Sequence, residues 1–450
     1  MNSQFGKDLT QGSVAINLIK FALPILLANM VSTAYSIVDM IWVGNLLGKD
    51  AVGAIAVTFP IFLGMIALSS GVTLASSILI SKAYGAKDLE RIQRIVNNSW
   101  SIAMIVILIF IVGGLMLSDS LLHMLGTSQQ MMPLAKGYLQ IIILNFAALY
   151  LNYLISSILR GIGDTVTPLK YVLISTAINA ILAPVLILGL GPLPRLALNG
   201  AAWATFLSTS ITTVLGMNYI LRQYRNQPIL PSKICLEKEI LQNIVGIGLP
   251  SFLQQMLISI GYGVTTIFVN HFGDAAIAAF GVANKMDSIV AMPAIAMMMA
   301  ASALTAQCIG AGKSEQIRDI FKWGILLNIP IILFISMTCV FFPDIIMSIF
   351  VKESEVIREG ITYLRIVGIS YLTYILFYIS NGIINGAGKT ISTMIISFIS
   401  LCIVRIPIAA YLSNTDLGIR GVWYAIVISS VITTVNSLGY YFLGRWRCGR

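Results

Sequence analysis

The sequence predicts an all-α integral membrane protein of about twelve transmembrane helices in two six-helix repeats. Hydrophobic residues make up 57% of its 450 residues and charged residues only 10%, whereas a soluble domain carries about 25% charged residues. Apolar runs of about 20 residues, long enough to cross the hydrocarbon core as helices, recur along the whole chain. These runs are too long and too continuously apolar for the strands of a membrane barrel.

The first half of the chain recurs in the second half, about 225 residues later. The matched positions include Leu23-Pro24 with Leu249-Pro250, Gly48 with Gly273, Gly85-Ala86 with Gly310-Ala311, Tyr138 with Tyr363, Gly161 with Gly386, and Gly200 with Gly421. Agreement at so many residues that shape turns indicates a duplicated unit, beyond the general similarity of membrane helices. We expect an N-terminal lobe at residues 1–222, a cytoplasmic linker at 223–240 and a C-terminal lobe at 241–450.

Each repeat supplies six expected spans, separated by short loops rich in Gly and polar residues. In the first repeat they are residues 16–41, 51–80, 96–118, 134–159, 170–190 and 200–221. In the second they are residues 242–270, 276–308, 319–341, 360–384, 392–411 and 421–443. Because the number per repeat is even, both copies enter from the same side, as in transporters whose two lobes enclose a central cleft.

The net charge of +10 follows the topology and does not indicate nucleic-acid binding. With both termini cytoplasmic, the inner loops hold nineteen Lys and Arg residues and the outer loops six, which is the positive-inside distribution. No Walker-type phosphate loop occurs, and the scattered cysteines lack metal-ligand spacing. We therefore expect no cofactor, no bound metal and no ATP hydrolysis, and coupling to an ion gradient remains the common alternative.

Asp39 is the first candidate for chemistry, because a carboxylate inside a span costs on the order of 3 kcal/mol. It ends a polar stripe of Asn29, Ser32 and Ser36 on one side of the first span, and Tyr35 flanks the same side. A low-dielectric environment disfavours the charged carboxylate, so Asp39 could bind a proton or sodium ion. The alternative is a helix-end carboxylate satisfied by water. The matching position of the second repeat is Thr265, which makes the coupling site asymmetric.

The C-terminal lobe carries four more intramembrane charges, which are Lys285, Asp287, Arg365 and Arg405. We expect them to neutralise one another as a network, because charges in a membrane find partners. A structural role is favoured over cation binding or contact with an anionic substrate.

Several methionines and polar residues are expected to border the cleft. They are Met30, Gln255, Met256, Tyr262, Met286 and Met292. Flexible, polarisable methionines suit ligands of varied shape, although ordinary packing explains them equally well. Pro24 removes a backbone hydrogen bond in the first span, so a kink is expected there, either coupled to Asp39 or static.

These residues resemble the multidrug and toxic compound extrusion (MATE) family over essentially the whole chain. The resemblance is carried by Pro24, Tyr35-Ser36-Ile37-Val38-Asp39, Gly85-Ala86, Arg160-Gly161-Ile162-Gly163-Asp164-Thr165 and Gly310-Ala311-Gly312. It implies two lobes that form a V, and a bacterial inner-membrane antiporter, expected as a monomer, that exports drug-like molecules as protons or sodium ions enter. The pattern is closer to the DinF-like branch of the family.

The resemblance also implies a coupling site around Asp39, supported by Tyr35 and Asn179. Asn152 and Thr205 are further candidate ligands of this site. Ala183 stands where relatives often have a second acid, and Gln254-Gln255 stand near a glutamate of the NorM-like branch. Sodium favours several oxygen ligands with negative charge, so a single acid favours protons.

Three other functions are alternatives to this one. A lipid-linked oligosaccharide flippase of the same superfamily is the nearest alternative, because Arg365 and Arg405 could contact a pyrophosphate. An enzyme is disfavoured because the two histidines, His123 and His271, fall in outer loops. A channel is disfavoured because no ring of charges lines a pore.

Overall fold

The chain is described by a computed structural model that covers residues 6–129, 131–190, 194–225, 227 and 229–444. Within these residues the secondary structure is entirely helical, as the sequence predicts. By packing, the chain divides into two compact units, unit 1 (residues 1–8 and 27–248) and unit 2 (residues 9–26 and 249–450).

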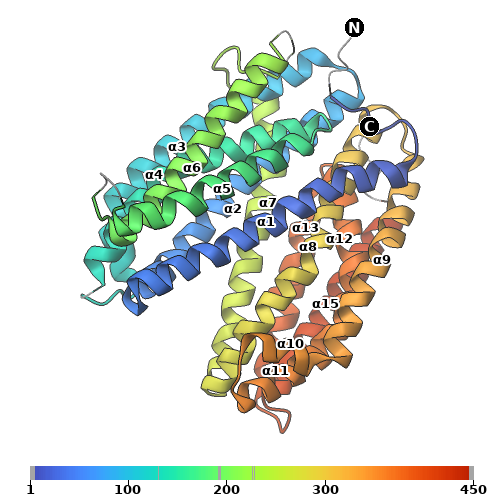
Figure 1. Cartoon of the computed structure of the whole chain (residues 1–450). Helices are drawn as coiled ribbons and strands as arrows, with labels where there is room; N and C mark the ends of the chain where they lie inside the picture. Colours follow the sequence, from blue (N-terminus) through green and yellow to red (C-terminus); the bar gives the residue numbers. More distant parts are fainter. Residues whose placement is uncertain (1–5, 130, 191–193, 226, 228, 445–450) are drawn as a thin grey trace. The chain divides into compact units, whose positions relative to one another are not determined.

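Unit 1 contains most of the first repeat (Figure 1). Its helices are the second part of α1 (Val14–Leu47), α2 (Lys49–Gly85), α3 (Leu89–Met124), α4 (Met132–Gly161), α5 (Val166–Leu188), α6 (Ala197–Gln223) and the start of α7 (Lys238–Asn270). Helix α4 packs against α2, α3 and α6, while α5 packs against α6. Small and branched apolar side chains form its core, including Ala54, Leu139 and Ala183.

Unit 2 contains most of the second repeat. Its helices are the remainder of α7, α8 (Asp274–Gly310), α9 (Gln316–Phe341), α10 (Pro343–Phe350), α11 (Ser354–Val367), α12 (Tyr371–Gly386), α13 (Thr390–Phe398), α14 (Ile406–Ser413) and α15 (Ile419–Phe442), together with the start of α1. A 3-10 turn, Gly368–Ser370, separates α11 from α12, and a π-helix, Ile399–Arg405, separates α13 from α14. Helix α8 packs against α9, α11 and α12.

Each unit takes in part of the first helix of the other repeat. Residues 9–26 of α1 group with unit 2, and residues 238–248 of α7 group with unit 1. Both changes fall beside the matched prolines, Pro24 and Pro250. The lobe boundaries at residues 222 and 241 follow the sequence repeat and stay a prediction, whereas packing assigns these two helix segments differently.

Eleven described helical segments are long and apolar enough to cross a membrane. The tenth expected span comprises α11 and α12, and the eleventh comprises α13, the π-helix and α14. The sixth expected span forms α6, but its sequence is less apolar than the others because it carries many Ser and Thr residues. Their hydroxyls are satisfied by carbonyls, as when Thr209 donates to Thr205 O at 2.8 Å and Thr213 donates to Ala148 O at 3.0 Å.

Matched glycines make the same close helix contacts in both units. A Cβ on Gly161 would lie 2.7 Å from Ile80 of α2, and one on Gly386 would lie 2.4 Å from the backbone oxygen of Ser302 in α8. The loops before α2 and α8 also agree, because Gly48 and Gly273 both have a positive φ. The duplication read from the sequence therefore extends to three-dimensional packing.

Candidate functional site

Asp39 lies in the part of α1 that belongs to unit 1, and its side chain is partly buried. Its Oδ1 atom is buried, and within the described part of the chain it has no hydrogen-bond partner. A buried polar atom left in this way costs about 1–3 kcal/mol. Burial without a partner therefore favours the states of Asp39 in which this oxygen binds a proton or contacts a cation.

One helical turn before Asp39, Tyr35 joins a polar cluster made by three helices. The hydroxyls of Tyr35 (α1) and Thr205 (α6) are 3.0 Å apart, and Asn179 Nδ2 (α5) donates to Thr205 Oγ1 at 3.3 Å. Thr205 donates its own hydrogen to Ala201 O at 3.1 Å. Tyr35 is consequently the donor in its bond with Thr205, and its oxygen retains lone pairs for another donor or a cation.

A further tyrosine belongs to this cluster, although the sequence reading did not place it there. Tyr138 of α4 lies within electrostatic range of both Asp39 and Tyr35. The sequence signal for Tyr138 is its match with Tyr363 in the second repeat. Three helices besides α1 therefore contribute polar side chains near Asp39.

Asn152 is not joined to this cluster, although the sequence places it among the candidate ligands of the coupling site. Its Nδ2 donates to Thr212 Oγ1 at 3.5 Å, and in the described residues no hydrogen bond links it to Tyr35, Asn179 or Thr205. Thr212 is about two turns further along α6 than Thr205. The hydrogen bond between Asn152 and Thr212 thus lies outside the Tyr35–Thr205–Asn179 cluster.

Ala183, which replaces the second acid of some relatives, is fully buried in the apolar core of unit 1. It lies one turn after Asn179 on α5, among residues such as Val43 and Ile187. An unpaired carboxylate would be strongly destabilised by these neighbours. This packing gives a physical reason for the small apolar residue.

The four charges of the second repeat are not joined by direct ion pairs in the described structure, so the expected network stays a prediction. Lys285 and Arg365 are exposed on their helices, and no ion pair within 4.0 Å joins any of the four described side chains. Asp287 is buried and accepts hydrogen bonds from Tyr363 at 2.6 Å and Tyr371 at 2.5 Å. Arg405 instead donates to Ser429 Oγ at 2.8 Å. The hydrogen-bond partners of Asp287 and Arg405 are therefore hydroxyl groups, while Arg405 lies within electrostatic range of Asp287.

The expected cleft residues differ in their surroundings. Gln255, Met256 and Tyr262 are exposed on α7, and Met30 is exposed on α1. Met286 and Met292 of α8 are half-buried, and Met286 packs against the apolar core of unit 2. Their role as a substrate surface stays a prediction, and so does a kink at Pro24, which lies inside α1.

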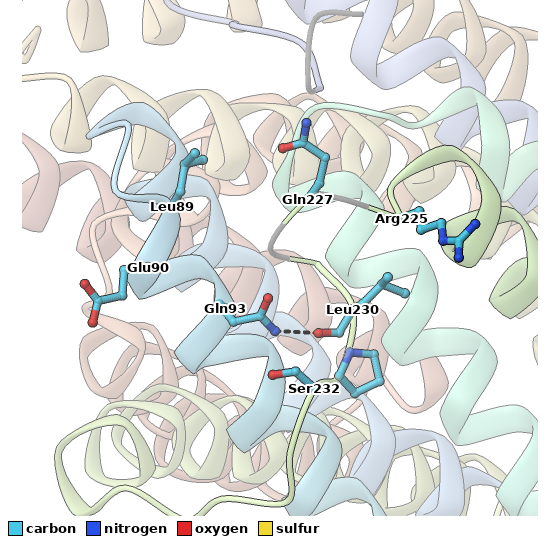
Figure 2. A pocket seen from close by; sticks show the side chains of 8 residues that line it. Leu89, Glu90, Gln93, Arg225, Gln227, Leu230 and Ser232 are labelled. Carbon is cyan, nitrogen blue, oxygen red and sulfur yellow. Dashed lines mark hydrogen bonds between the residues drawn. The ribbon is translucent and has the colours of Figure 1, made fainter.

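A surface pocket of about 650 Å³ lies between the first turns of α3 and the linker (Figure 2). Its lining is mixed, with Leu89, Glu90 and Gln93 on one side and Arg225 and Leu230 on the other. Gln93 Nε2 crosses it to donate to Leu230 O at 2.5 Å. None of the expected site residues lines this pocket, so we do not assign it to transport.

The fold and these sites define a multi-pass membrane protein of the transporter class, built from two copies of one helical unit. The family model described as MatE matches residues 24–185 and again residues 250–411. The chain therefore belongs to the MatE family, whose members are transporters and not enzymes, as the sequence predicts.

Relatives and solved structures agree with this assignment. The chain is 32% identical to YoeA of Bacillus subtilis, a probable multidrug resistance protein, over 94% of this chain and 92% of that one. It is 31% identical to a second such protein of B. subtilis, YpnP, covering 98% and 97% of the two chains. An outward-facing multidrug resistance MATE transporter of known structure matches with a TM-score of 0.90 and 25% identity, covering 99% and 98%.

Proposed function

We propose that this protein is a secondary active antiporter that exports cationic or amphipathic organic compounds in exchange for protons, with Asp39 as the coupling carboxylate. The observation that carries the proposal is the buried, unpartnered Oδ1 of Asp39 beside the Tyr35–Thr205–Asn179 cluster. A carboxylate in this position gains a partner when it binds a proton or a cation. It is thus suited to alternate between two states as the transporter turns over.

Protons are favoured over sodium by the composition of the cluster. A hard cation is held by several oxygen atoms, commonly with more than one negative charge. Asp39 is accompanied by hydroxyl and amide groups, and the apolar Ala183 occupies the position of a second acid. Sodium remains the alternative ion, and the transport experiment below separates the two.

The proposed substrate contacts, taken for each unit by itself, are Met30 in unit 1 and Gln255, Met256 and Tyr262 in unit 2. All four side chains are exposed on their helices. Methionine and tyrosine side chains suit flat, cationic or amphipathic molecules, through polarisable contacts and ring faces. The description of YoeA and YpnP as multidrug resistance proteins supports this substrate class.

The proposed location is the inner, cytoplasmic membrane of a bacterium, with both termini and the linker on the cytoplasmic side. Basic residues support this orientation, because Arg91 and Arg94 lie at the start of α3 and Arg222 and Arg225 lie at the end of α6. The two matched relatives named above are bacterial. We propose that the monomer is the working unit.

The flippase alternative gains no support from the two arginines that suggested it. Arg405 is held by Ser429, and Arg365 lies on an exposed face of α11 without contact to Arg405 among the described residues. Recognition of a pyrophosphate favours arginines that converge on one site. The antiporter is accordingly the function that the described geometry supports best.

The decisive experiment is efflux of a cationic dye from proteoliposomes under separately imposed proton and sodium gradients. We expect the wild type to respond to the proton gradient and Asp39→Asn to lose that response. Asp119→Asn is the matched control, because Asp119 is an exposed acid of the same unit, paired with Lys136 at 2.7 Å. Wild-type efflux by Asp39→Asn would refute the coupling role, and a response to sodium alone would identify the other ion.

A further inference from the structure

Among the acids whose burial the structure describes, Asp287 is the most buried, and the proposed function does not use it. The residue is only 6% exposed and lies in α8, within unit 2. Both carboxylate oxygens are occupied, Oδ2 by the hydroxyl of Tyr363 and Oδ1 by that of Tyr371. Hydrogen bonds of 2.6 and 2.5 Å are in the range of charge-assisted O–H···O⁻ bonds.

The two tyrosines lie on opposite sides of a break in one span. Tyr363 belongs to α11, and Tyr371 is the first residue of α12, directly after the 3-10 turn Gly368–Ser370. Asp287 therefore connects the two helices across the turn. Ser336 of α9 also holds the turn, donating to Gly368 O at 2.6 Å. Short 3-10 segments inside a longer helix often mark hinges.

The first repeat offers an internal comparison. There the matching span is the continuous helix α4, Met132–Gly161. At the repeat spacing, Tyr138 matches Tyr363, but Phe146 matches Tyr371 and Phe62 matches Asp287. The helix break, the acid and the second hydroxyl thus occur together in the second repeat only. This coincidence indicates that they serve one purpose.

The groups around Asp287 bear on which ion it binds. Titratable or charged side chains that face it from the neighbouring elements are Tyr262 (α7), Cys339 (α9), Tyr363 (α11), Tyr371, Tyr374 and Tyr378 (α12), and Arg405 (π-helix). Arg405 is the cation among them, and it makes no ion pair with Asp287 in the described structure, since its Nε donates to Ser429. A metal cation needs several free oxygens, whereas here both carboxylate oxygens already accept O–H groups. A proton needs only one of them.

We propose that Asp287 is a second proton-binding carboxylate of the transporter, and that its protonation releases the bridge across the break between α11 and α12. The ionised carboxylate accepts from both tyrosines. Once protonated, one oxygen carries a hydrogen and becomes a donor, so the tyrosine facing it has to turn its own hydroxyl away or move. The bond at the other oxygen also loses its charge assistance. The proton comes from water and returns to it, and no other covalent bond forms or breaks.

This inference deepens the proposed function and rests on it for its role in transport, but binding at Asp287 can be measured without transport. The purified full-length protein in lipid nanodiscs is titrated from about pH 9 to about pH 4 while infrared difference spectra record the carboxylic-acid C=O band. We expect acidification to produce a band that is missing from Asp287→Asn and present in Asp39→Asn and Asp119→Asn. A complete set of bands in Asp287→Asn would overturn the proposal, whatever Asp39→Asn does in efflux.

The release of the bridge has its own readout, which a purely static contact would not show. Amide hydrogen exchange is expressed relative to the intrinsic rate at each pH, because the intrinsic rate itself falls on acidification. On this scale, exchange of residues 363–374 should rise as the Asp287 band appears, while residues 138–149 of the matching helix α4 should not change. In Asp287→Asn the faster exchange should be present at every pH. Exchange that stays independent of pH in the wild type would overturn the proposed release.

Tyr371→Phe tests the same proposal in a variant that keeps the acid, in case Asp287→Asn folds poorly. The charged carboxylate then loses one of its two donors, so the Asp287 band should appear at a higher pH than in the wild type. Phenylalanine is the natural residue at the matching position of the first repeat, Phe146, so the ring itself is compatible with this packing. An unchanged midpoint in Tyr371→Phe would contradict the proposal.

Discussion

Tyr138 and Tyr363 occupy the same position in the two repeats, and each faces an acid of its own unit. Tyr138 lies within electrostatic range of Asp39, and Tyr363 donates a 2.6 Å hydrogen bond to Asp287. The acids themselves are not matched, because one lies in α1 and the other in α8. The two repeats therefore have tyrosines at matching positions, but the acids near these tyrosines lie at positions that do not match.

Replacing these tyrosines by phenylalanine should have unequal effects on stability. Tyr363 is 1% exposed and directly bonded, so Tyr363→Phe leaves a buried carboxylate oxygen without its donor, which costs about 1–3 kcal/mol. Tyr138 is half-buried, and in the described structure no hydrogen bond joins it to Asp39, so Tyr138→Phe should cost less than about 1 kcal/mol. Thermal unfolding in detergent measures both, and equal destabilisation would contradict this reasoning.

The hydroxyl of Tyr35 should matter for transport more than for stability. Tyr35→Phe removes the donor to Thr205 and leaves Asp39 with a less polar surrounding. Loss of one hydrogen bond of about 1 kcal/mol corresponds to a change of roughly fivefold in ion affinity. Dye efflux at several proton gradients measures the effect, and Thr209→Val, which removes a hydroxyl bonded only to its own helix backbone at 2.8 Å, is the control. An identical response of the two variants would argue against a role for Tyr35.

Hydropathy and the repeat predict the helical class, the duplication and the helix order, because these depend on periodic burial and on turn residues. The family resemblance allows residues of different helices to be grouped from the sequence, namely Asp39, Tyr35 and Asn179. Thr205 is a further candidate for the same group. Asp287 is expected from the sequence in a charge network, whereas its hydrogen-bond partners are tyrosines 76 and 84 residues away. Contacts between distant helices, and the break at Gly368–Ser370, leave no periodic signal along the chain.

The linker is fastened to α3, and this contact should depend on pH. Arg94 Nε donates to Glu237 Oε2 at 2.6 Å, and this hydrogen bond holds the pKa of the Glu237 carboxyl below its usual range. A depressed pKa in the folded state gives stabilisation that is present above the ordinary pKa of Glu, about 4.3, and is lost as the pH falls through the lower folded value. Cleavage of the linker by pepsin, a protease that is active in acid, should therefore increase as the pH falls below the folded-state pKa of Glu237 and not above it.

Arg94→Gln provides the test of that linkage. Without the guanidinium, Glu237 should titrate in its ordinary range, so release of the linker should begin at a higher pH than in the wild type. Arg91→Gln is the matched control, because Arg91 makes only a 3.5 Å exposed contact with Glu239. Linker release at the same pH in all three proteins would show that the Arg94–Glu237 contact does not govern it.

Uncharged side chains of α3 should hold the linker more strongly than this ion pair. Asn98 Oδ1 accepts from the Glu237 amide at 2.7 Å, and Asn97 Oδ1 accepts from the Ser232 amide at 2.9 Å. Both asparagines are buried, so an alanine leaves a backbone N–H without its acceptor at a cost of about 1–3 kcal/mol. We expect Asn98→Ala to expose Lys233 to trypsin at neutral pH, and resistance equal to that of the wild type would refute this.

The matched glycines allow a prediction in which the repeat supplies its own comparison. An alanine at Gly386 would place its Cβ 2.4 Å from the Ser302 backbone oxygen, whereas at Gly161 the nearest atom is a side-chain carbon of Ile80 at 2.7 Å. Ile80 can turn its Cγ2 away but not its Cβ, which lies 2.8 Å from the added carbon, so both alanines overpack a helix contact, at a cost of about 1–3 kcal/mol. The contact at Gly386 is the closer one and is made with a backbone oxygen. Gly386→Ala should therefore lower the unfolding temperature more than Gly161→Ala. Gly263→Ala, where no atom lies within 4 Å of the added Cβ, should leave it unchanged or raise it.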